Sequence, residues 1–281
     1  MRAIPADFEP ATVAAIDAKL AELIHDEQIA MPLAIESGSR AWGFASPDSD
    51  YDCRFLYVRR EVDYLTPWPA RDVIEVPLEG DLDINGWDII KAIPLIVKGN
   101  AVVLEWLQSP VVYQADLAFR DALLGFAQAH ASRDLIIRHH YHLGERQRRT
   151  YFAPGAEVPI KKLFYVLRPA ATLRWMRVHA DRAVPPMHFP TLMAECNPPA
   201  EIGRIVDDLI ARKAVTREMG AAPVPAEIDR FIDAEYAFGA AISPEPIETA
   251  EVRAAGSALF TQLVRQYSPD RAEPRPRRLQ P

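Results

Sequence analysis

The residues of this chain most able to do chemistry are acidic and lie close together in the sequence. Asp50 and Asp52 stand at the start of the apolar and aromatic segment 51–58, with one residue between them. Side chains of a strand alternate between its faces, so both carboxylates would project from one face, roughly 7 Å apart along the backbone. Aligned carboxylates repel each other unless a proton or a cation lies between them. The spacing therefore predicts a cation site, and hard oxygen ligands suit Mg²⁺ or Mn²⁺.

A glycine–serine turn precedes the two aspartates. Gly38 and Ser39 follow the short apolar run 33–35, and a short helix is expected directly after them. The first N–H groups of a helix have no partner within the helix, so they can bind phosphate. Gly38 permits close approach of the backbone, and the hydroxyl group of Ser39 adds a donor. The turn is a candidate phosphate site, and Arg40 is a further candidate contact.

A third carboxylate from a neighbouring strand would complete a site for two cations, which can activate an attacking oxygen and stabilise a leaving one. The segment 81–88 (DLDINGWD) offers the candidates. Asp88 directly precedes a helical pattern, and Asp is favoured as an N-cap residue, so we assign it to capping. Asp83 lies within the expected strand and is the predicted third carboxylate. Asp81 would share its face and remains the alternative.

These features together resemble the signature of the DNA polymerase beta-like nucleotidyltransferase superfamily. That signature is a Gly-Ser turn, then an Asp-X-Asp strand, then a separate third Asp; here the first two read GSRAWGF and SPDSDYD. The runs DINGWD, KGN, EWLQSP and KKLFYVLRP are similar to one branch, the RlaP-like predicted nucleotidyltransferases found with RNA repair genes. The resemblance covers much of residues 30–190. Pro94 departs from the pattern, because a leucine-like residue is expected there.

The resemblance implies an enzyme that transfers a nucleoside monophosphate from a nucleoside triphosphate to an acceptor hydroxyl group and releases pyrophosphate. It implies Mg²⁺ or Mn²⁺ on Asp50, Asp52 and Asp83, and the triphosphate on the Gly38–Ser39 turn. The branch favours an RNA end as acceptor, although a protein, an antibiotic or a metabolite hydroxyl would fit the same chemistry. The alternative is a catalytically silent module that binds nucleotide or RNA.

The elements that must position these residues follow from the hydrophobic pattern, which predicts an α+β fold with a small mixed sheet. A helix is expected over 10–29 and strands over 33–35, 51–58, 73–76 and 82–87. After residue 101 the pattern is almost entirely helical. The predicted helices cover 102–107, 115–130, 132–151, 160–179, 199–220, 225–240 and 249–267. We therefore expect a nucleotidyltransferase domain at residues 1–112, an α-helical domain at 113–267 and a disordered tail at 268–281.

The charge of the chain is unevenly distributed, although the formal net charge is only −7. Residues 1–130 carry a net charge of −11, and residues 131–182 carry +7. In the basic segment, Lys161, Tyr165 and Arg168 fall on one helical face at i, i+4 and i+7. The two cations could bind phosphates and the tyrosine could stack on a base. Alternatively, this helix packs its apolar residues inward and leaves the cations in solvent.

The remaining features exclude several classes of protein. No run of about 18 apolar residues is present, so we expect no membrane-spanning helix. The N-terminal residues lack the apolar run of a secretory signal. The two cysteines, Cys53 and Cys196, cannot form a disulfide framework, which favours a reducing, cytoplasmic location. The histidines at 139–142 (HHYH) lack the further ligands of a zinc site, so we expect them to be structural.

Overall fold

The computed structural model describes residues 1–152, 157–216, 220–244 and 249–269. Within this part of the chain, apolar strands build a mixed sheet of five strands in the order β3-β4-β2-β1-β5. Strands β2 and β4 are parallel, and the other neighbours in the sheet are antiparallel. The parallel pair brings the beginnings of β2 and β4 to the same edge of the sheet. The strands are β1 (Ala30–Glu36), β2 (Tyr51–Val58), β3 (Val73–Glu75), β4 (Leu82–Asp88) and β5 (Val112–Ala115).

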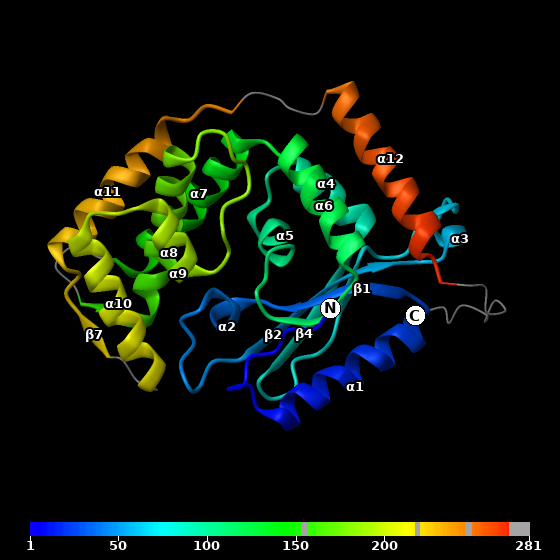
Figure 1. Ribbon diagram of the computed structural model, residues 1–281, viewed down its shortest axis with the longest axis horizontal. Coiled ribbons are helices and arrows are strands. Elements are labelled where there is room, and N and C mark those ends of the chain that lie inside the picture. Colours follow the sequence, from blue (N-terminus) through cyan, green and yellow to red (C-terminus); the bar gives the residue numbers. More distant parts are fainter. Residues whose placement is uncertain (153–156, 217–219, 245–248, 270–281) are drawn as a thin grey trace.

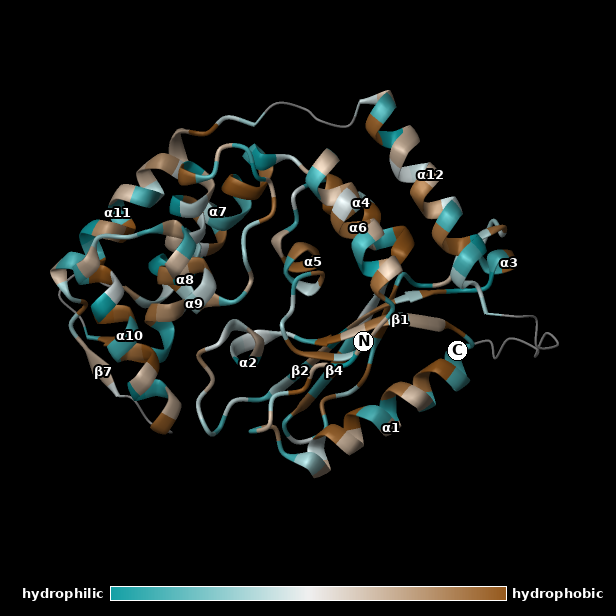
Figure 2. Cartoon of the chain, in the orientation of Figure 1, coloured by the Kyte–Doolittle hydropathy of each residue, from teal (hydrophilic) through white to brown (hydrophobic). Residues whose placement is uncertain are grey.

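Helices cover both faces of the sheet because each face is apolar (Figures 1 and 2). Helix α1 (Pro10–Glu27) packs Val13, Ile16 and Leu20 against one face, where Cys53 and Phe55 of β2 are buried. On the other face, apolar residues of β1 and β2 form a larger hydrophobic core with four helices. These are α4 (Ile89–Val97), α5 (Ala101–Trp106), α6 (Leu117–His130) and α12 (Ala250–Tyr267).

A second group of helices lies beside the sheet (Figure 1). At its centre is α8 (Ile160–Val178), which is buried along most of its length and packs against α7, α9 and α11. Strand β6 (Val158–Pro159) directly precedes α8 and pairs with the distant strand β7 (Ala221–Ala222) in a separate antiparallel sheet of two strands. The other members are α7 (Arg133–Tyr151), α9 (Phe189–Cys196), α10 (Ala200–Val215) and α11 (Ala226–Ala241). None of the described helices is both long enough and apolar enough to cross a membrane.

Local signals place the start of α4 as predicted. The Oδ1 atom of Asp88 accepts a hydrogen bond from the N–H of Ile90 at 3.0 Å, so Asp88 is the N-cap. Pro94 lies inside the helix, which nevertheless continues to Val97. Because proline has no N–H, this turn lacks one helical hydrogen bond. Gly99 follows with φ +63°, as expected of a residue that ends a helix.

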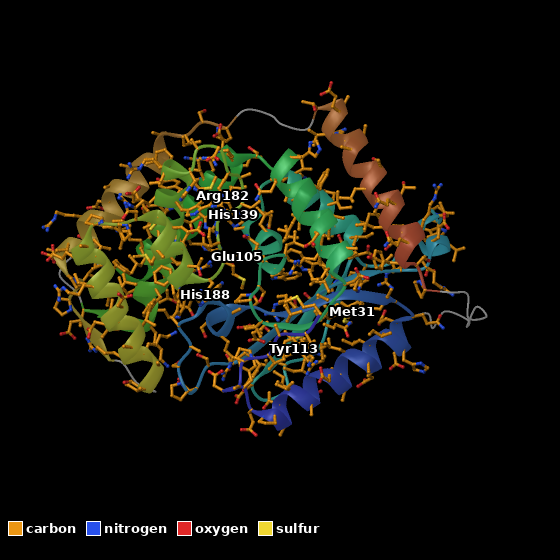
Figure 3. The ribbon with its side chains drawn as sticks, viewed as in Figure 1. Met31, Glu105, Tyr113, His139, Arg182 and His188 are labelled. Atoms are coloured by element: carbon orange, nitrogen blue, oxygen red, sulfur yellow. The ribbon has the colours of Figure 1, made fainter. Side chains whose placement is uncertain are left out.

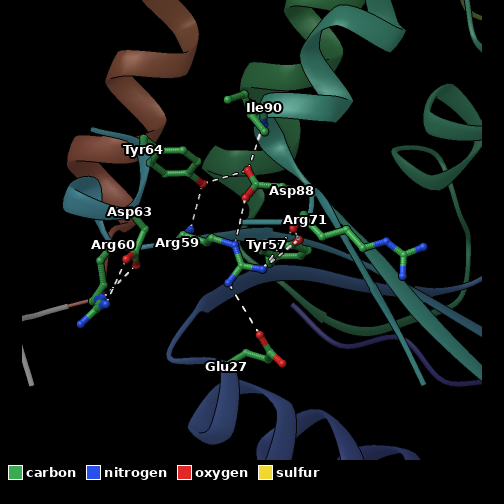
Figure 4. A network of polar contacts seen from close by, with 9 residues as sticks. All are labelled: Glu27, Tyr57, Arg59, Arg60, Asp63, Tyr64, Arg71, Asp88 and Ile90. Carbon is green, nitrogen blue, oxygen red and sulfur yellow. Dashed lines mark hydrogen bonds and ion pairs between the residues drawn. The ribbon is translucent and has the colours of Figure 1, made fainter. Parts of the chain in front are cut away.

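A network of polar contacts fixes the far end of β2 and β4 (Figure 4). Asp88 also accepts a hydrogen bond from the hydroxyl group of Tyr64 of the short helix α3 (Glu61–Tyr64), at 2.8 Å. Arg59, which follows β2, lies 3.6 Å from Asp88 and 3.7 Å from Glu27 at the end of α1. The network therefore joins α1, α3 and α4 to the sheet at the end opposite to Asp50 and Asp52.

The α+β fold is confirmed, whereas the division of the chain after residue 112 remains a prediction. Strand β5 begins at residue 112 and pairs with β1. The helical pattern did not predict β5, because a strand of four residues is too short to show a period. Helices α6 and α12 also pack against the sheet or its covering helices. The sheet half of the molecule thus includes residues from both ends of the chain.

The disordered tail predicted for residues 268–281 lies outside the described residues from position 270 onward. Of its first two residues, Ser268 is in contact with the sheet half: its hydroxyl group accepts a hydrogen bond from the N–H of Glu61 at 2.8 Å. The short helix α3 and the end of α12 are therefore held together.

Candidate active site

The parallel pairing of β2 and β4 brings two of the predicted carboxylates together. Asp52 and Asp83 are directly opposite in register, and both lie at the beginnings of their strands. The Nη2 atom of Arg54 lies 3.0 Å from Oδ1 of Asp52 and 2.6 Å from Oδ2 of Asp83. Asp50 lies just before β2 at the same edge. The alternative residue, Asp81, uses its main-chain oxygen to accept the N–H of Tyr51 at 2.8 Å.

The guanidinium group shows that this donor set fits a cation. Two carboxylates from neighbouring strands converge on one positively charged nitrogen, and oxygen ligands of this type suit Mg²⁺ or Mn²⁺. As the side chains stand, no three His, Cys, Asp or Glu residues in the described part of the chain are arranged as metal ligands. The cation nearest to the two aspartates is Arg54 itself.

Gly38 is held directly against Asp52. It begins the short helix α2 (Gly38–Trp42) with φ +60°, a conformation that favours glycine. A Cβ atom at this position would collide with Oδ2 of Asp52. The preceding residue, Ser37, donates its N–H to the main-chain oxygen of Asp52 at 2.8 Å. The turn and the carboxylate therefore have a fixed relative position, which requires a glycine.

A buried acid, Glu36, lies behind the site at the end of β1. Its Oε1 atom accepts the N–H of Asp52 at 2.8 Å, and its Oε2 atom accepts the hydroxyl group of Tyr113 at 2.6 Å. Figure 3 shows Tyr113 on the side of the sheet that α1 covers. Burial raises the pKa of Glu36 to about 7. Sequence reasoning missed this residue; the available signal was a lone acid at the end of an apolar strand directly before the Gly-Ser turn.

Burial also raises the pKa of Asp52. The neighbouring charges of Asp83 and Asp50 raise it further, whereas the guanidinium group of Arg54 opposes the shift. The ionised carboxylates therefore depend on a nearby positive charge. In this structure Arg54 supplies that charge.

A cavity of about 430 Å³ opens at this edge of the sheet. Gly38, Ser39, Asp50 and Asp52 lie on one side, and helices α5, α8 and α10 supply the other, whereas Asp83 does not line the cavity. Acidic and hydroxyl groups thus face lysine and aromatic side chains across one space. The residues lining the cavity are Ser37, Gly38, Ser39, Trp42, Ser46, Asp48, Ser49, Asp50, Asp52, Arg54, Val102, Trp106, Lys161, Tyr165 and Lys213.

Two lysines reach the cavity from the second group of helices. The Nζ atom of Lys161 lies 2.9 Å from Oδ2 of Asp48, in an ion pair between α8 and the loop before β2. Lys213 of α10 is buried, donates to the main-chain oxygen of Phe44 at 2.6 Å and lies 4.6 Å from the centre of its ring. Burial, with repulsion from Lys161, lowers the pKa of Lys213 to about 8. Its sequence pattern is that of an ordinary amphipathic helix, so nothing in the sequence singled it out.

Two of the predicted arginines do not line this cavity. Arg40 donates to the main-chain oxygens of Ser49 (2.6 Å) and Asp50 (3.1 Å), and its guanidinium group lies 3.9 Å from the ring centre of Tyr51. It lines a neighbouring hollow of about 520 Å³ on the other side of the loop, together with the acidic residue Glu9. Arg40 therefore fastens the loop between α2 and β2.

Arg168 is buried in an ion pair, although Lys161 and Tyr165 of the same helix reach the cavity. Its Nη1 atom lies 2.6 Å from Oε1 of Glu105, and its guanidinium group lies 4.0 Å from the ring centre of Trp42. The indole N–H of Trp42 donates to Oε2 of Glu105 at 3.1 Å. Glu105 lies near the centre of the molecule (Figure 3). These contacts join α2, α5 and α8, so Arg168 positions the wall of the cavity.

The histidines of α7 do not form a metal site in the described part of the chain. His140 is buried, and burial lowers its pKa well below the usual value. Burial also lowers the pKa of His139, which lies near Glu105 (Figure 3). The structural role of the three histidines remains a prediction.

A match to a family model assigns the chain to the class of DNA polymerase beta-like nucleotidyltransferases. The chain belongs to the RlaP family, the RNA repair pathway DNA polymerase beta family, which matches residues 13–258. This match confirms the resemblance seen in the motifs. The chain is also 38% identical to the uncharacterized protein YcgL of Bacillus subtilis (strain 168) over 202 residues, which cover 72% of this chain and 76% of YcgL.

Proposed function

We propose that this protein transfers a nucleoside monophosphate from a nucleoside triphosphate to an acceptor hydroxyl group, with release of pyrophosphate. The observation that carries the proposal is the convergence of Asp52 and Asp83 on Arg54. Asp52 and Arg54 line a cavity that also contains a Gly-Ser turn and two lysines. Carboxylates on one side and lysines on the other match a substrate that consists of a cation and a polyphosphate.

The proposed roles of the cavity residues follow from their chemistry. Gly38 and Ser39 bind phosphate oxygens through main-chain N–H and hydroxyl donors. Lys161 and Lys213 neutralise the charge of the triphosphate. Tyr165 presents an aromatic face on which a base of any type can stack, and this contact does not select one nucleotide.

Asp50, Asp52 and Asp83 would hold Mg²⁺ or Mn²⁺, which when bound polarises the phosphate and favours loss of the proton from the acceptor hydroxyl group. In the transfer, the acceptor oxygen bonds to the α-phosphorus and the bond from that phosphorus to the bridging oxygen breaks. Pyrophosphate leaves with the bonding electron pair. The hydroxyl proton is released to solvent.

We favour an RNA end as the acceptor. The description of the family refers to RNA repair, and the basic segment 131–182 contributes Lys161 and Tyr165 to the cavity. A cytoplasmic location remains a prediction and agrees with this acceptor.

The proposal is tested by incubation of the protein with each labelled nucleoside triphosphate, Mg²⁺ or Mn²⁺, and RNA, protein or small-molecule acceptors. The double variant Asp50→Asn, Asp52→Asn should lose at least about 100-fold in the rate of pyrophosphate release. The matched control is Asp207→Asn, Asp208→Asn, which removes two exposed carboxylates from α10 and should retain the rate. Nucleotide binding without pyrophosphate release with any acceptor would instead favour the catalytically silent binding module.

A further inference from the structure

Arg54 makes four polar contacts at the edge of the sheet. Its Nη1 atom donates to the main-chain oxygens of Cys53 (3.0 Å) and Asp83 (2.7 Å). Its Nη2 atom donates to the carboxylates of Asp52 (3.0 Å) and Asp83 (2.6 Å). One end of the guanidinium group is thus anchored on the backbone, while the other end occupies the point where the two carboxylates converge.

This arrangement offsets the repulsion between two carboxylates when no substrate is bound. The carboxylates of Asp52 and Asp83 lie close enough to repel each other, and the site is half-buried. Without a cation, such a pair binds a proton or moves apart. The guanidinium group removes the repulsion, because its Nη2 atom contacts both carboxylates while the main-chain oxygens hold its Nη1 atom.

We propose that Arg54 is an internal counter-cation, which holds Asp52 and Asp83 in position in the free protein and competes with a divalent cation for their oxygens. The inference rests on the proposed function and assigns to Arg54 a positioning role in it. A divalent cation bound by these carboxylates requires Nη2 to leave them. The anchor on the main-chain oxygens keeps the displaced guanidinium group at the cavity, where the phosphates of a nucleoside triphosphate are its new partner.

The direction in which cation affinity changes when Arg54 is replaced distinguishes this role from a purely structural one. If Arg54 competes with the cation, removing its charge strengthens cation binding in the absence of nucleotide. If Arg54 only maintains the shape of the site, removing it weakens cation binding. Nucleotide should also strengthen cation binding more in the wild-type protein than in the variant, because only the wild type must first displace Arg54.

The experiment measures Mn²⁺ binding by the electron paramagnetic resonance signal of free Mn²⁺, without nucleotide. Arg54→Gln should bind Mn²⁺ roughly tenfold more tightly than the wild type. The matched control is Arg60→Gln, which removes the same charge from an arginine paired with Asp63 at 2.9 Å near the opposite end of β2. Arg60→Gln should bind Mn²⁺ as the wild type does.

Thermal unfolding gives a second readout that does not depend on activity. In a chelator, Arg54→Gln should unfold at a lower temperature than the wild type, and Mn²⁺ should raise that temperature more in the variant. Arg54→Lys keeps the charge but lacks the fork, so its Mn²⁺ affinity should lie between the two; it also serves if the glutamine variant does not fold.

If folded Arg54→Gln binds Mn²⁺ no more tightly than the wild type, the proposed role of Arg54 is wrong. If the wild type nevertheless transfers nucleotide, the proposed function remains intact. A wild-type protein that binds no Mn²⁺, either alone or with any nucleoside triphosphate, would count against the proposed function itself.

Discussion

Gly38 has no Cβ atom, and this allows the carboxylate of Asp52 to lie directly against it. The variant Gly38→Ala should transfer nucleotide roughly 100-fold more slowly, because the new Cβ displaces that carboxylate. The matched control is Gly80→Ala, since Gly80 has the same φ of +60° but open space around it. Rates measured under identical conditions separate the collision from the backbone strain that both variants share. Equal losses in the two variants would show that strain alone is responsible.

Glu36 should make the stability of the protein depend on pH. Its pKa of about 7 in the folded protein lies above the ordinary value of 4.5, so the folded state retains a proton that the unfolded state has lost. The stabilisation is complete below pH 4.5 and is lost as the pH rises to about 7. Relative to Glu36→Gln, the wild type should lose about 3 kcal/mol of unfolding free energy across this range.

Urea denaturation of the wild type and of Glu36→Gln at several pH values from 4.5 to 7.5 measures this difference. The glutamine side chain can still accept the N–H of Asp52 and contact Tyr113, so it is a close structural match. A difference in unfolding free energy that does not change with pH would show that Glu36 is ionised throughout.

The sequence indicated the aspartates, the Gly-Ser turn, Lys161 and Tyr165 of the candidate site, but not Glu36, Arg54 or Lys213. Strand alternation and the Gly-Ser turn indicated Asp50 and Asp52, and the nearby apolar segment indicated Asp83, because local pattern and strand pairing suffice for these. Arg54 lies two residues after Asp52 on β2, so strand alternation alone could have placed it beside that carboxylate, whereas Lys213 owes its position to tertiary packing. Lys213 is 169 positions from its partner in the loop after α2, and no local pattern reports such a contact.

At the level of secondary structure, α10 places one lysine in the cavity. Lys213→Met should bind nucleoside triphosphate roughly tenfold more weakly, because the triphosphate loses one cationic partner. With a pKa of about 8, Lys213 loses its charge as the pH rises through 8, so the affinity of the wild type should fall there and that of the variant should fall less.

Nucleotide titrations by calorimetry between pH 6.5 and 9 measure both effects. Lys19→Met is the matched control, since Lys19 lies on α1 and pairs with Glu22 at 3.0 Å. Identical pH profiles for the wild type and Lys213→Met would exclude Lys213 from the triphosphate site.

The ion pair of Glu105 and Arg168 joins the helices around the cavity. Glu105→Ala should reduce the free energy of unfolding by about 3–5 kcal/mol, because it leaves the buried guanidinium group of Arg168 without its partner. Adding Arg168→Met should recover part of this loss. Denaturation of the single and double variants tests the coupling, with the exposed residue Glu22 as control: Glu22→Ala should cost about 1 kcal/mol or less. Additive losses in the double variant would contradict the pairing.

The elements themselves were predicted more completely than their arrangement. Helix α4 begins at the predicted cap, Asp88, because that signal is local. Strand β5 and helix α9 were not predicted from the sequence. Both are short and are stabilised by buried apolar residues, so neither shows a clear hydrophobic period. Pairing of β5 with β1, far away in the sequence, is a consequence of the whole fold.

At the level of the whole molecule, α12 returns the chain to the sheet half. Its Leu263 and Val264 are buried, and Tyr267 packs edge-on against Phe119 of α6. A chain that ends at residue 248 should therefore lose roughly 3–6 kcal/mol of unfolding free energy from these two aliphatic side chains alone. A chain that ends at residue 269 is the control and should unfold like the full chain. Urea denaturation followed by circular dichroism compares them, and equal midpoints would show that α12 is dispensable.

The two halves of the molecule each contain one buried thiol. Cys53 faces α1 behind the sheet, and Cys196 ends α9 within the second group of helices. Burial raises the pKa of both thiols, so a labelling reagent modifies either one only when its surroundings open. Because mass spectrometry distinguishes the two labelled peptides, the unmodified wild-type chain carries its own pair of reporters. Their relative labelling rates give the order in which the sheet and the helical group open.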